Sequence, residues 1–174
     1  MSQVLQTSPI PFRAFGRAPG VEKRDFLSLY DLSVLEVGAL LDLAAEVKAH
    51  PAAFAKALEG RTAALIFEKP SLRTRVSFEV GLLQLGAHGI YLAPADIGLG
   101  KRESVKDVAR NLALWVDVLV MRTFSQRILE DMALQGGIPV INALSDLLHP
   151  FQTVAELLTL RECKGQLRGL RVAF

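Results

Sequence analysis

The residues Ser71 to Arg75 combine hydroxyl and guanidinium groups at a point where an apolar run gives way to a helical pattern. The apolar run, residues 62–67, has the length of a buried strand, and Pro70 ends it. A helix that begins near residue 71 leaves its first backbone N–H groups without partners inside the helix, and a phosphate can accept from them. This strand-to-helix turn is therefore a candidate anion site.

Helical spacing separates the side chains of this turn into two groups. The apolar residues recur every three or four positions, so we expect them to form one stripe that faces the sheet: Leu72, Val76, Val80 and Leu83. Ser71, Arg73 and Thr74 then lie near the start of the helix, where their donors and the helix dipole suit phosphate oxygens. Leu72 can still contribute its backbone N–H.

A structural role is the alternative for Arg75. Glu79 lies four residues later, close in angle to the apolar stripe, and a partly shielded carboxylate there needs a cationic partner. We therefore predict an ion pair between Arg75 and Glu79 and assign phosphate binding to Arg73. Two arginines within five residues also occur on ordinary solvated helix faces, so a solvated face without ligand binding is the alternative interpretation of this motif.

Helix and strand patterns alternate along the rest of the chain. Ser33 and Glu36 form a capping box at the start of a helix that ends near residue 50. Further helices are predicted at residues 72–85, 104–114, 125–134 and 151–162, strands at 62–67, 88–92, 116–121 and 138–141, and loops at 93–102 and 142–150. This alternation predicts an α/β fold with three α/β/α layers, a parallel sheet and right-handed crossovers.

Polar residues follow several strands of this predicted sheet. The Ser71 turn follows the first strand, Arg122 follows residue 121, and His149 and Gln152 follow the last strand. Ligands of such sheets bind beyond the carboxyl ends of the strands, so we expect these residues to converge on one rim. Taken singly, Arg122 can be a solvated strand-end charge and His149 a helix cap. Together, an imidazole and an amide three residues apart can hold a carbonyl oxygen and an amide nitrogen.

The composition of the 174 residues describes a globular protein, with 51% hydrophobic and 22% charged residues. A net charge of +2 is too weak to indicate nucleic-acid binding. Cys163 is the only cysteine, which excludes an internal disulfide and a cysteine-based metal site within one chain. The apolar stretches are too short to span a bilayer. We expect a cytoplasmic protein with no metal, no cofactor, and no nucleic-acid or membrane partner.

Residues 1–24 lack helical or strand periodicity, and we expect them to form an N-terminal tail. They lack the apolar core of a secretory signal. No acidic residue precedes Glu22, so an organellar transit peptide is the alternative.

Taken together, these residues resemble the aspartate/ornithine carbamoyltransferase family, whose carbamoyl-phosphate-binding domain carries S-T-R-T-R and H-P-x-Q. The resemblance runs from about residue 24 to residue 174. It rests on F-E-K-P-S-L-R-T-R at 67–75, L-G-K-R-E-S-V-K-D-V-A-R-N-L at 99–112 and H-P-F-Q at 149–152. The second of these stretches, and D-F-L-S-L-Y-D-L-S at 25–33, are more similar to ornithine than to aspartate carbamoyltransferases.

The resemblance implies that the ligand is carbamoyl phosphate. Its phosphate would be held by Ser71, the Leu72 backbone, Arg73 and Thr74, and its carbamoyl group by Arg122, His149 and Gln152. The neutral δ-amine of ornithine would attack the carbonyl carbon, phosphate would leave, and citrulline would form, in arginine biosynthesis or the arginine deiminase route. Arg73, Arg122 and His149 would be catalytic, by stabilising charge on the carbonyl oxygen and the departing phosphate. The family also implies a homotrimer.

Two positions depart from the family pattern. Leu72 stands where the family usually has threonine, which is tolerable if only its backbone donor is used. Gly98 stands where many ornithine enzymes place a polar residue that reaches the site of the neighbouring subunit. Lys101 or Arg102 are the candidates to replace that contact.

The resemblance also implies a domain organisation. We expect residues 25–165 to be the carbamoyl-phosphate-binding domain and residues 166–174 to be a linker and the start of a second, ornithine-binding domain, whose motifs this chain lacks. On this interpretation the chain is a fragment or truncated product with little activity alone. The alternatives are an aspartate or other amino-acid carbamoyltransferase, and a non-catalytic module for anion binding or oligomerisation.

Overall fold

The computed structural model describes residues 24–99 and 102–173. Nearly all of the predicted tail, and Lys101, lie outside these residues. Within the part of the chain that the structure describes, no helix combines the length and the apolar character needed to cross a bilayer.

One sheet of parallel strands forms the centre of the molecule. Its strands are β1 (Thr62–Phe67), β2 (His88–Leu92), β3 (Val118–Arg122) and β4 (Val140–Leu144), in the spatial order β2-β1-β3-β4. Most strand side chains are apolar because both faces of a parallel sheet are covered by helices. The predicted parallel α/β fold is confirmed.

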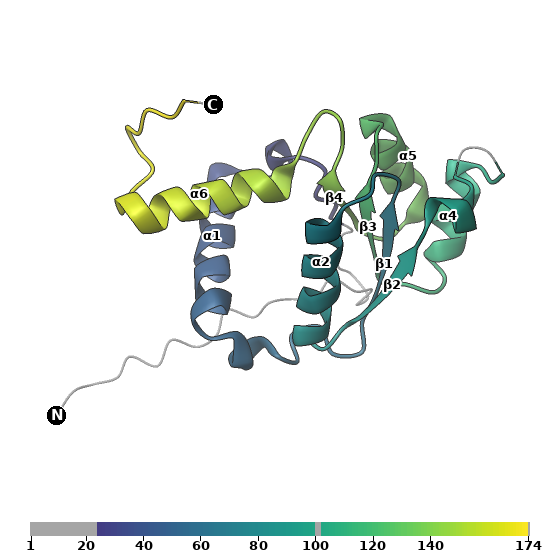
Figure 1. Cartoon of the computed structure of the whole chain (residues 1–174), viewed down its shortest axis with the longest axis horizontal. Coiled ribbons are helices and arrows are strands. Elements are labelled where there is room, and N and C mark those ends of the chain that lie inside the picture. The colour runs from purple at the N-terminus through teal and green to yellow at the C-terminus, as the bar shows by residue number, and fades with distance from the viewer. Residues whose placement is uncertain (1–23, 100–101, 174) are drawn as a thin grey trace.

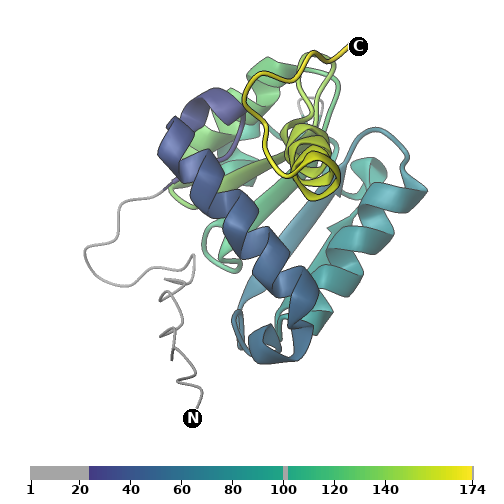
Figure 2. The same cartoon turned by 90° about the vertical axis from the view of Figure 1, so that its left-hand side faces the viewer.

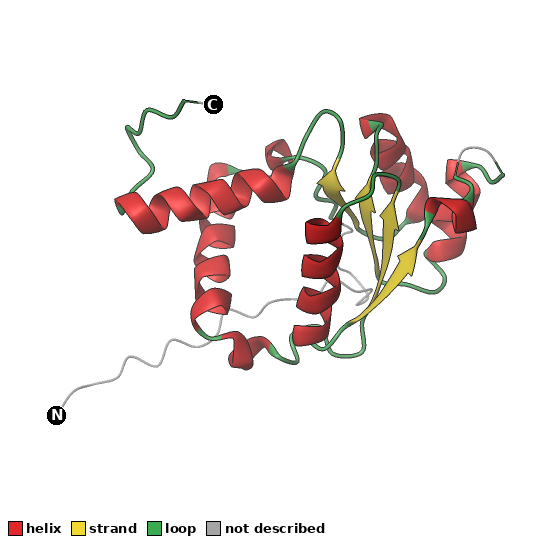
Figure 3. Ribbon diagram, in the orientation of Figure 1, coloured by secondary structure: helices red, strands yellow, loops and turns green. Residues whose placement is uncertain are grey.

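The α-helices divide between the two faces of the sheet (Figures 1 and 3). Their bounds are α1 (Val34–Ala49), α2 (Leu72–Gln84), α3 (Pro94–Ile97), α4 (Val105–Leu112), α5 (Gln126–Gly136) and α6 (Pro150–Lys164), with short 3-10 turns at Leu29–Asp31 and Pro51–Phe54. The larger core cluster joins α4 and α5 to one face, through residues such as Val108, Leu129 and Met132. The smaller cluster joins α2 to the other face.

Helix α1 stands away from the sheet, beside α6 (Figures 1 and 2). The predicted capping box at its start is present, with the Glu36 carboxylate accepting from the Ser33 N–H at 2.7 Å. Two ion pairs join α1 to α6, Lys48 with Glu162 at 2.8 Å and Asp42 with Arg161 at 2.6 Å.

The structure differs from the predicted bounds at several places. The last strand begins at Val140 rather than residue 138, because Gly137 ends α5 with a φ of 71° and Pro139 has no N–H for a ladder. Arg122 is the final residue of β3 instead of the residue after it. The predicted loop 93–102 contains the short helix α3, which begins with Pro94.

The prediction that the apolar stripe of α2 faces the sheet is wrong. Its members point to solvent, with exposed fractions of 78% for Leu72, 48% for Val76, 44% for Val80 and 73% for Leu83. Phe78 and Leu82 pack on the sheet instead. They follow Thr74 at four-residue intervals, so they share its face of the helix. Thr74 is tied to the end of β3 by a 3.2 Å hydrogen bond from Arg122, which agrees with this rotation of α2.

This arrangement predicts unequal effects of two alanine substitutions on α2. Phe78→Ala removes a ring that packs on the sheet and lies 5.1 Å from the Phe151 ring, so the free energy of unfolding should fall by about 2 kcal/mol. Val76→Ala, on the exposed stripe, should change it by less than about 0.5 kcal/mol. Urea unfolding followed by circular dichroism measures both, and equal losses would contradict the rotation of α2 described above.

Candidate functional site

The order of the strands places a crevice between the ends of β1 and β3. From β1 the chain passes through α2 to β2 on one side, and β3 lies on the other side of β1. Connections that leave two adjacent strands in opposite directions open a gap at the carboxyl edge of the sheet, where α/β proteins bind ligands. The Ser71 turn and Arg122 lie at this point.

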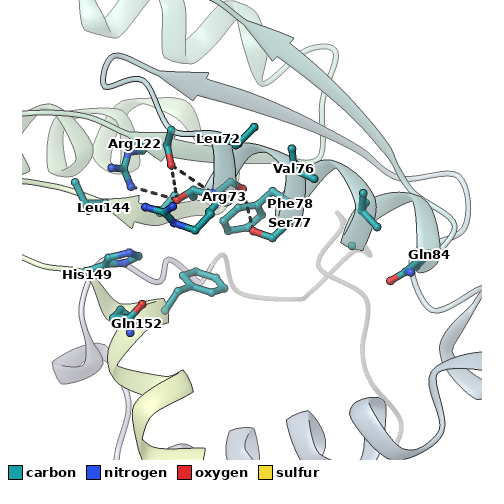
Figure 4. A pocket seen from close by; sticks show the side chains of 16 residues that line it. Leu72, Arg73, Val76, Ser77, Phe78, Gln84, Arg122, Leu144, His149 and Gln152 are labelled. Atoms are coloured by element: carbon teal, nitrogen blue, oxygen red, sulfur yellow. Dashed lines mark hydrogen bonds between the residues drawn. The ribbon is translucent and has the colours of Figure 1, made fainter. Parts of the chain in front are cut away.

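The start of α2 is a capped helix end that is linked to Arg122. Ser71 is the N-cap residue, and its hydroxyl accepts from the Thr74 N–H at 3.3 Å. The Thr74 hydroxyl oxygen accepts from the Ser71 hydroxyl at 2.9 Å and from Nη1 of Arg122 at 3.2 Å (Figure 4). The start of α2 and the last residue of β3 thus form one hydrogen-bonded group at the positive end of the helix dipole.

Arg122 is partly withdrawn from water and is not the solvated strand-end charge that its position alone allows. Its Nε is buried and has no hydrogen-bond partner. Burial is the main cause that lowers the pKa of Arg122, and the positive charge of Arg73 lowers it further. Two guanidinium groups beside a helix N-terminus, with donors left unpaired, form a site that an anion would stabilise.

His149 occupies the N-cap position of α6, but its side chain makes no capping hydrogen bond. Its Nδ1 is buried without a hydrogen-bond partner. The pKa of His149 is lowered first by burial and then by the charge of Arg122, while Glu156 acts in the opposite direction. The imidazole is therefore favoured in its neutral form and keeps its nitrogens available for a ligand.

All of the predicted site residues line one open cavity of about 1090 Å³. They are Ser71, Leu72, Arg73, Thr74, Arg122, His149 and Gln152. Figure 4 shows Arg73 and Arg122 on one side of this cavity and His149 and Gln152 across from them. The Gln152 amide nitrogen donates to Glu156 at 3.0 Å, so this side chain already has a partner one helical turn away.

Sequence reasoning missed other residues that line the cavity, among them Ser77, Gln84, Leu144 and Phe151. Phe151 lies inside the H-P-F-Q motif, which was the one available signal for it. Ser77 and Gln84 face the cavity because α2 is rotated away from the predicted orientation. No group of three metal-ligating side chains occurs within residues 24–99 and 102–173.

Arg75 has the structural role that its spacing predicts. Its Nε donates to the Glu79 carboxylate at 2.9 Å, and its guanidinium carbon lies 3.6 Å from the centroid of the Tyr91 ring. The hydrogen bond to Glu79 is the largest cause that raises the pKa of Arg75. Arg75 is absent from the cavity lining, so Arg73 is the arginine of this turn that faces the candidate site.

Gly98 has a conformational reason to be glycine. Its φ is +60°, and a Cβ at this position would lie 2.8 Å from the Cβ of Arg102. Arg102, which the sequence suggested as a replacement for the missing polar contact, donates to the Asp96 carbonyl at 2.7 Å and so turns back onto its own loop. Lys101, the other suggested replacement, lies outside the described residues.

The arrangement can hold a doubly charged phosphate beside a polar carbonyl group. The N-terminal start of α2 supplies N–H and hydroxyl donors, Arg73 and Arg122 supply positive charge, and His149 supplies a neutral imidazole across the cavity. Such preorganised donors stabilise negative charge that develops during acyl transfer.

Comparison with known proteins agrees with this geometry. Residues 24–162 match the model of the aspartate/ornithine carbamoyltransferase carbamoyl-P binding domain. The chain is 50% identical over 152 residues to the ornithine carbamoyltransferase of Deinococcus radiodurans, an alignment that covers 87% of this chain and 49% of the relative. For the enzyme of Shewanella oneidensis the identity is 46% over 151 residues, with 87% and 50% covered.

Solved structures show the same similarity. The ornithine carbamoyltransferase of Thermus thermophilus superimposes with a TM-score of 0.80 at 43% identity, covering 86% of this chain and 52% of that one. For the enzyme of Pyrococcus furiosus the TM-score is 0.82 at 41% identity, with 84% and 48% covered. The chain thus spans about half the length of the curated relatives that it matches. By the extent of the family match and the shared fold, the chain belongs to the aspartate/ornithine carbamoyltransferase family.

Proposed function

We propose that residues 25–165 form the carbamoyl-phosphate-binding domain of an ornithine carbamoyltransferase. One observation carries this proposal: the unpaired buried nitrogens of Arg122 and His149 belong to residues that line the same cavity as Arg73 and the start of α2. Phosphate at the α2 end would place the attached carbamoyl group between Arg122 and His149. The names of the relatives favour ornithine as the second substrate.

The proposed reaction is the transfer of the carbamoyl group to the δ-amine of ornithine. The lone pair of the neutral amine attacks the carbonyl carbon, the bond from this carbon to the bridging oxygen breaks, and phosphate leaves with the electron pair. The amine loses a proton to the departing phosphate, and the products are citrulline and hydrogen phosphate. Arg122 and His149 stabilise the negative charge on the carbonyl oxygen, while Arg73 and the donors of Ser71 and Thr74 stabilise the departing phosphate.

The second substrate needs binding groups of its own. We propose that the ornithine-binding groups belong to the half of the relatives that this chain does not match, with residues 166–174 as the connection. On this proposal the chain binds carbamoyl phosphate and turns over little alone. We place the enzyme in the cytoplasm, in arginine biosynthesis or the arginine deiminase route.

A homotrimer is the proposed assembly. The number of three comes from the family resemblance, and the exposed stripe on α2 supports contact between subunits, because large apolar side chains on one helix face mark a contact surface: Leu72, Val76, Val80 and Leu83. Leu72, Val76 and Val80 also line the cavity, so a subunit that covered this stripe would close one side of the site.

Two arginine variants test the site. Arg73→Ala removes a charged group from the cavity. The concentration of inorganic phosphate needed for a given rise in melting temperature should therefore increase by about tenfold. Arg75→Ala is the matched control, because it removes the same charge two residues away from a side chain that pairs with Glu79. Thermal unfolding over a range of phosphate concentrations measures both. Equal ligand dependence in Arg73→Ala and the unmodified chain would contradict the assignment of Arg73.

The charges around His149 predict pKa changes of opposite sign. Arg122→Gln removes a positive charge that lowers the pKa of His149, so this pKa should rise toward its ordinary value. Glu156→Gln removes a negative charge that raises the pKa, so the pKa should fall further. NMR titration of the imidazole, assigned with a His149→Gln variant, measures both changes. Shifts of the same sign would show that His149 does not lie between these groups.

A further inference from the structure

The loops that carry the site residues are joined to one another by hydrogen bonds. The Thr123 hydroxyl donates to the Glu68 carboxylate, and the Glu68 N–H donates to the Arg122 carbonyl at 2.8 Å. The Asp146 N–H donates to the Phe124 carbonyl at 3.0 Å. The loops after β1, β3 and β4 therefore form one connected rim.

Lys69 makes the ionic link in this rim. Its ammonium group pairs with the Asp146 carboxylate and lies 4.8 Å from the centroid of the Phe124 ring. The Lys69 side chain is only 20% exposed, whereas that of Asp146 is 64% exposed, so the cation is held between loops and not in open water. Lys69 is absent from the cavity lining, which separates it from the groups that would contact a ligand.

The turn that Lys69 contacts is compact and leads directly to His149. The Ser145 hydroxyl accepts from the Leu147 N–H at 3.2 Å and the Leu148 N–H at 3.0 Å. The Ser145 N–H donates to the Leu148 carbonyl at 2.9 Å. Because these bonds make residues 145–148 one unit, a shift of Asp146 moves the start of α6 with it.

We propose that Lys69 is a positioning residue that sets the distance between the phosphate-holding end of α2 and His149. The proposal deepens the proposed function and rests on it. Lys69 lies two residues before Ser71, and Asp146 lies three residues before His149, so their ion pair joins the two halves of the cavity close to both. An ion pair with one partner this exposed adds little to folding stability, so its main effect is geometric.

Two ligands of different length separate positioning from direct binding. Inorganic phosphate needs only the part of the cavity at the N-terminal start of α2. Phosphonoacetamide, a stable analogue in which a methylene group replaces the bridging oxygen of carbamoyl phosphate, needs both ends at the correct separation. Loss of a positioning contact should therefore lower the affinity for phosphonoacetamide much more than the affinity for phosphate. Loss of a side chain that binds the phosphate group directly should lower both affinities alike.

The experiment compares Lys69→Met, Asp146→Asn, the double variant and Lys69→Arg by calorimetric titration, with Lys106→Met as control for the lost charge. We expect phosphonoacetamide affinity to fall by about tenfold in both single variants and no further in the double variant. Phosphate affinity should fall by less than about twofold, and Lys69→Arg should retain most of the phosphonoacetamide affinity. Equal losses for the two ligands, or a lower melting temperature with unchanged affinities, would overturn the proposal.

A measurement without ligand keeps this proposal distinct from the proposed function. If Lys69 and Asp146 anchor the start of α6, either single variant should expose the imidazole and move the pKa of His149 back toward its ordinary value. An unchanged NMR titration of His149 in both variants would overturn the positioning role even where the ligands bind. Failure of the unmodified chain to bind either ligand would instead refute the proposed function.

Discussion

The hydrogen bond from Arg122 to Thr74 joins the strand and the helix on which the candidate site depends. It ties the end of β3 to the first turn of α2, so the rotation of this helix about its axis is constrained at the N-terminal end that faces the candidate site. Phe78 and Leu82 follow Thr74 on the same face and fill the space above the sheet. The apolar stripe is left in solvent, and Ser77 and Gln84 are turned toward the cavity.

Unpaired charge is the second property of the site. The positive charge of Arg73 contributes to lowering the pKa of Arg122. Three nearby carboxylates are bound to other partners: Glu79 to Arg75, Asp146 to Lys69 and Glu156 to Gln152. A pair of guanidinium groups left in this state gains more from an incoming anion than a neutralised pair would. Burial first, and then the charge of Arg122, lower the pKa of His149.

Sequence alone predicted the features that depend on short-range rules. Strand β1, the Ser33 capping box and the Arg75–Glu79 pair follow from residues at most six apart, and the convergence of Arg122 and His149 follows from the topology of parallel sheets. The rotation of α2 was mispredicted because this helix has two apolar faces, and periodicity cannot say which one meets the sheet. The contact between Lys69 and Asp146 spans 77 residues and leaves no local pattern.

The spacing of Thr74, Phe78 and Leu82 also limits how α2 can evolve. One inserted residue between Thr74 and Phe78 would turn the remainder of the helix by about 100° relative to its start. Ser77 and Gly81 would then take the sheet-facing positions of Phe78 and Leu82, while the hydroxyl of Thr74 would stay bound to Arg122. The first turn of α2 would keep its contact with Arg122, but the rest of the helix would no longer present its large apolar side chains to the sheet. The packing of α2 on the sheet therefore tolerates substitutions on the exposed stripe, but one added residue would prevent the helix from binding Arg122 and packing on the sheet at the same time.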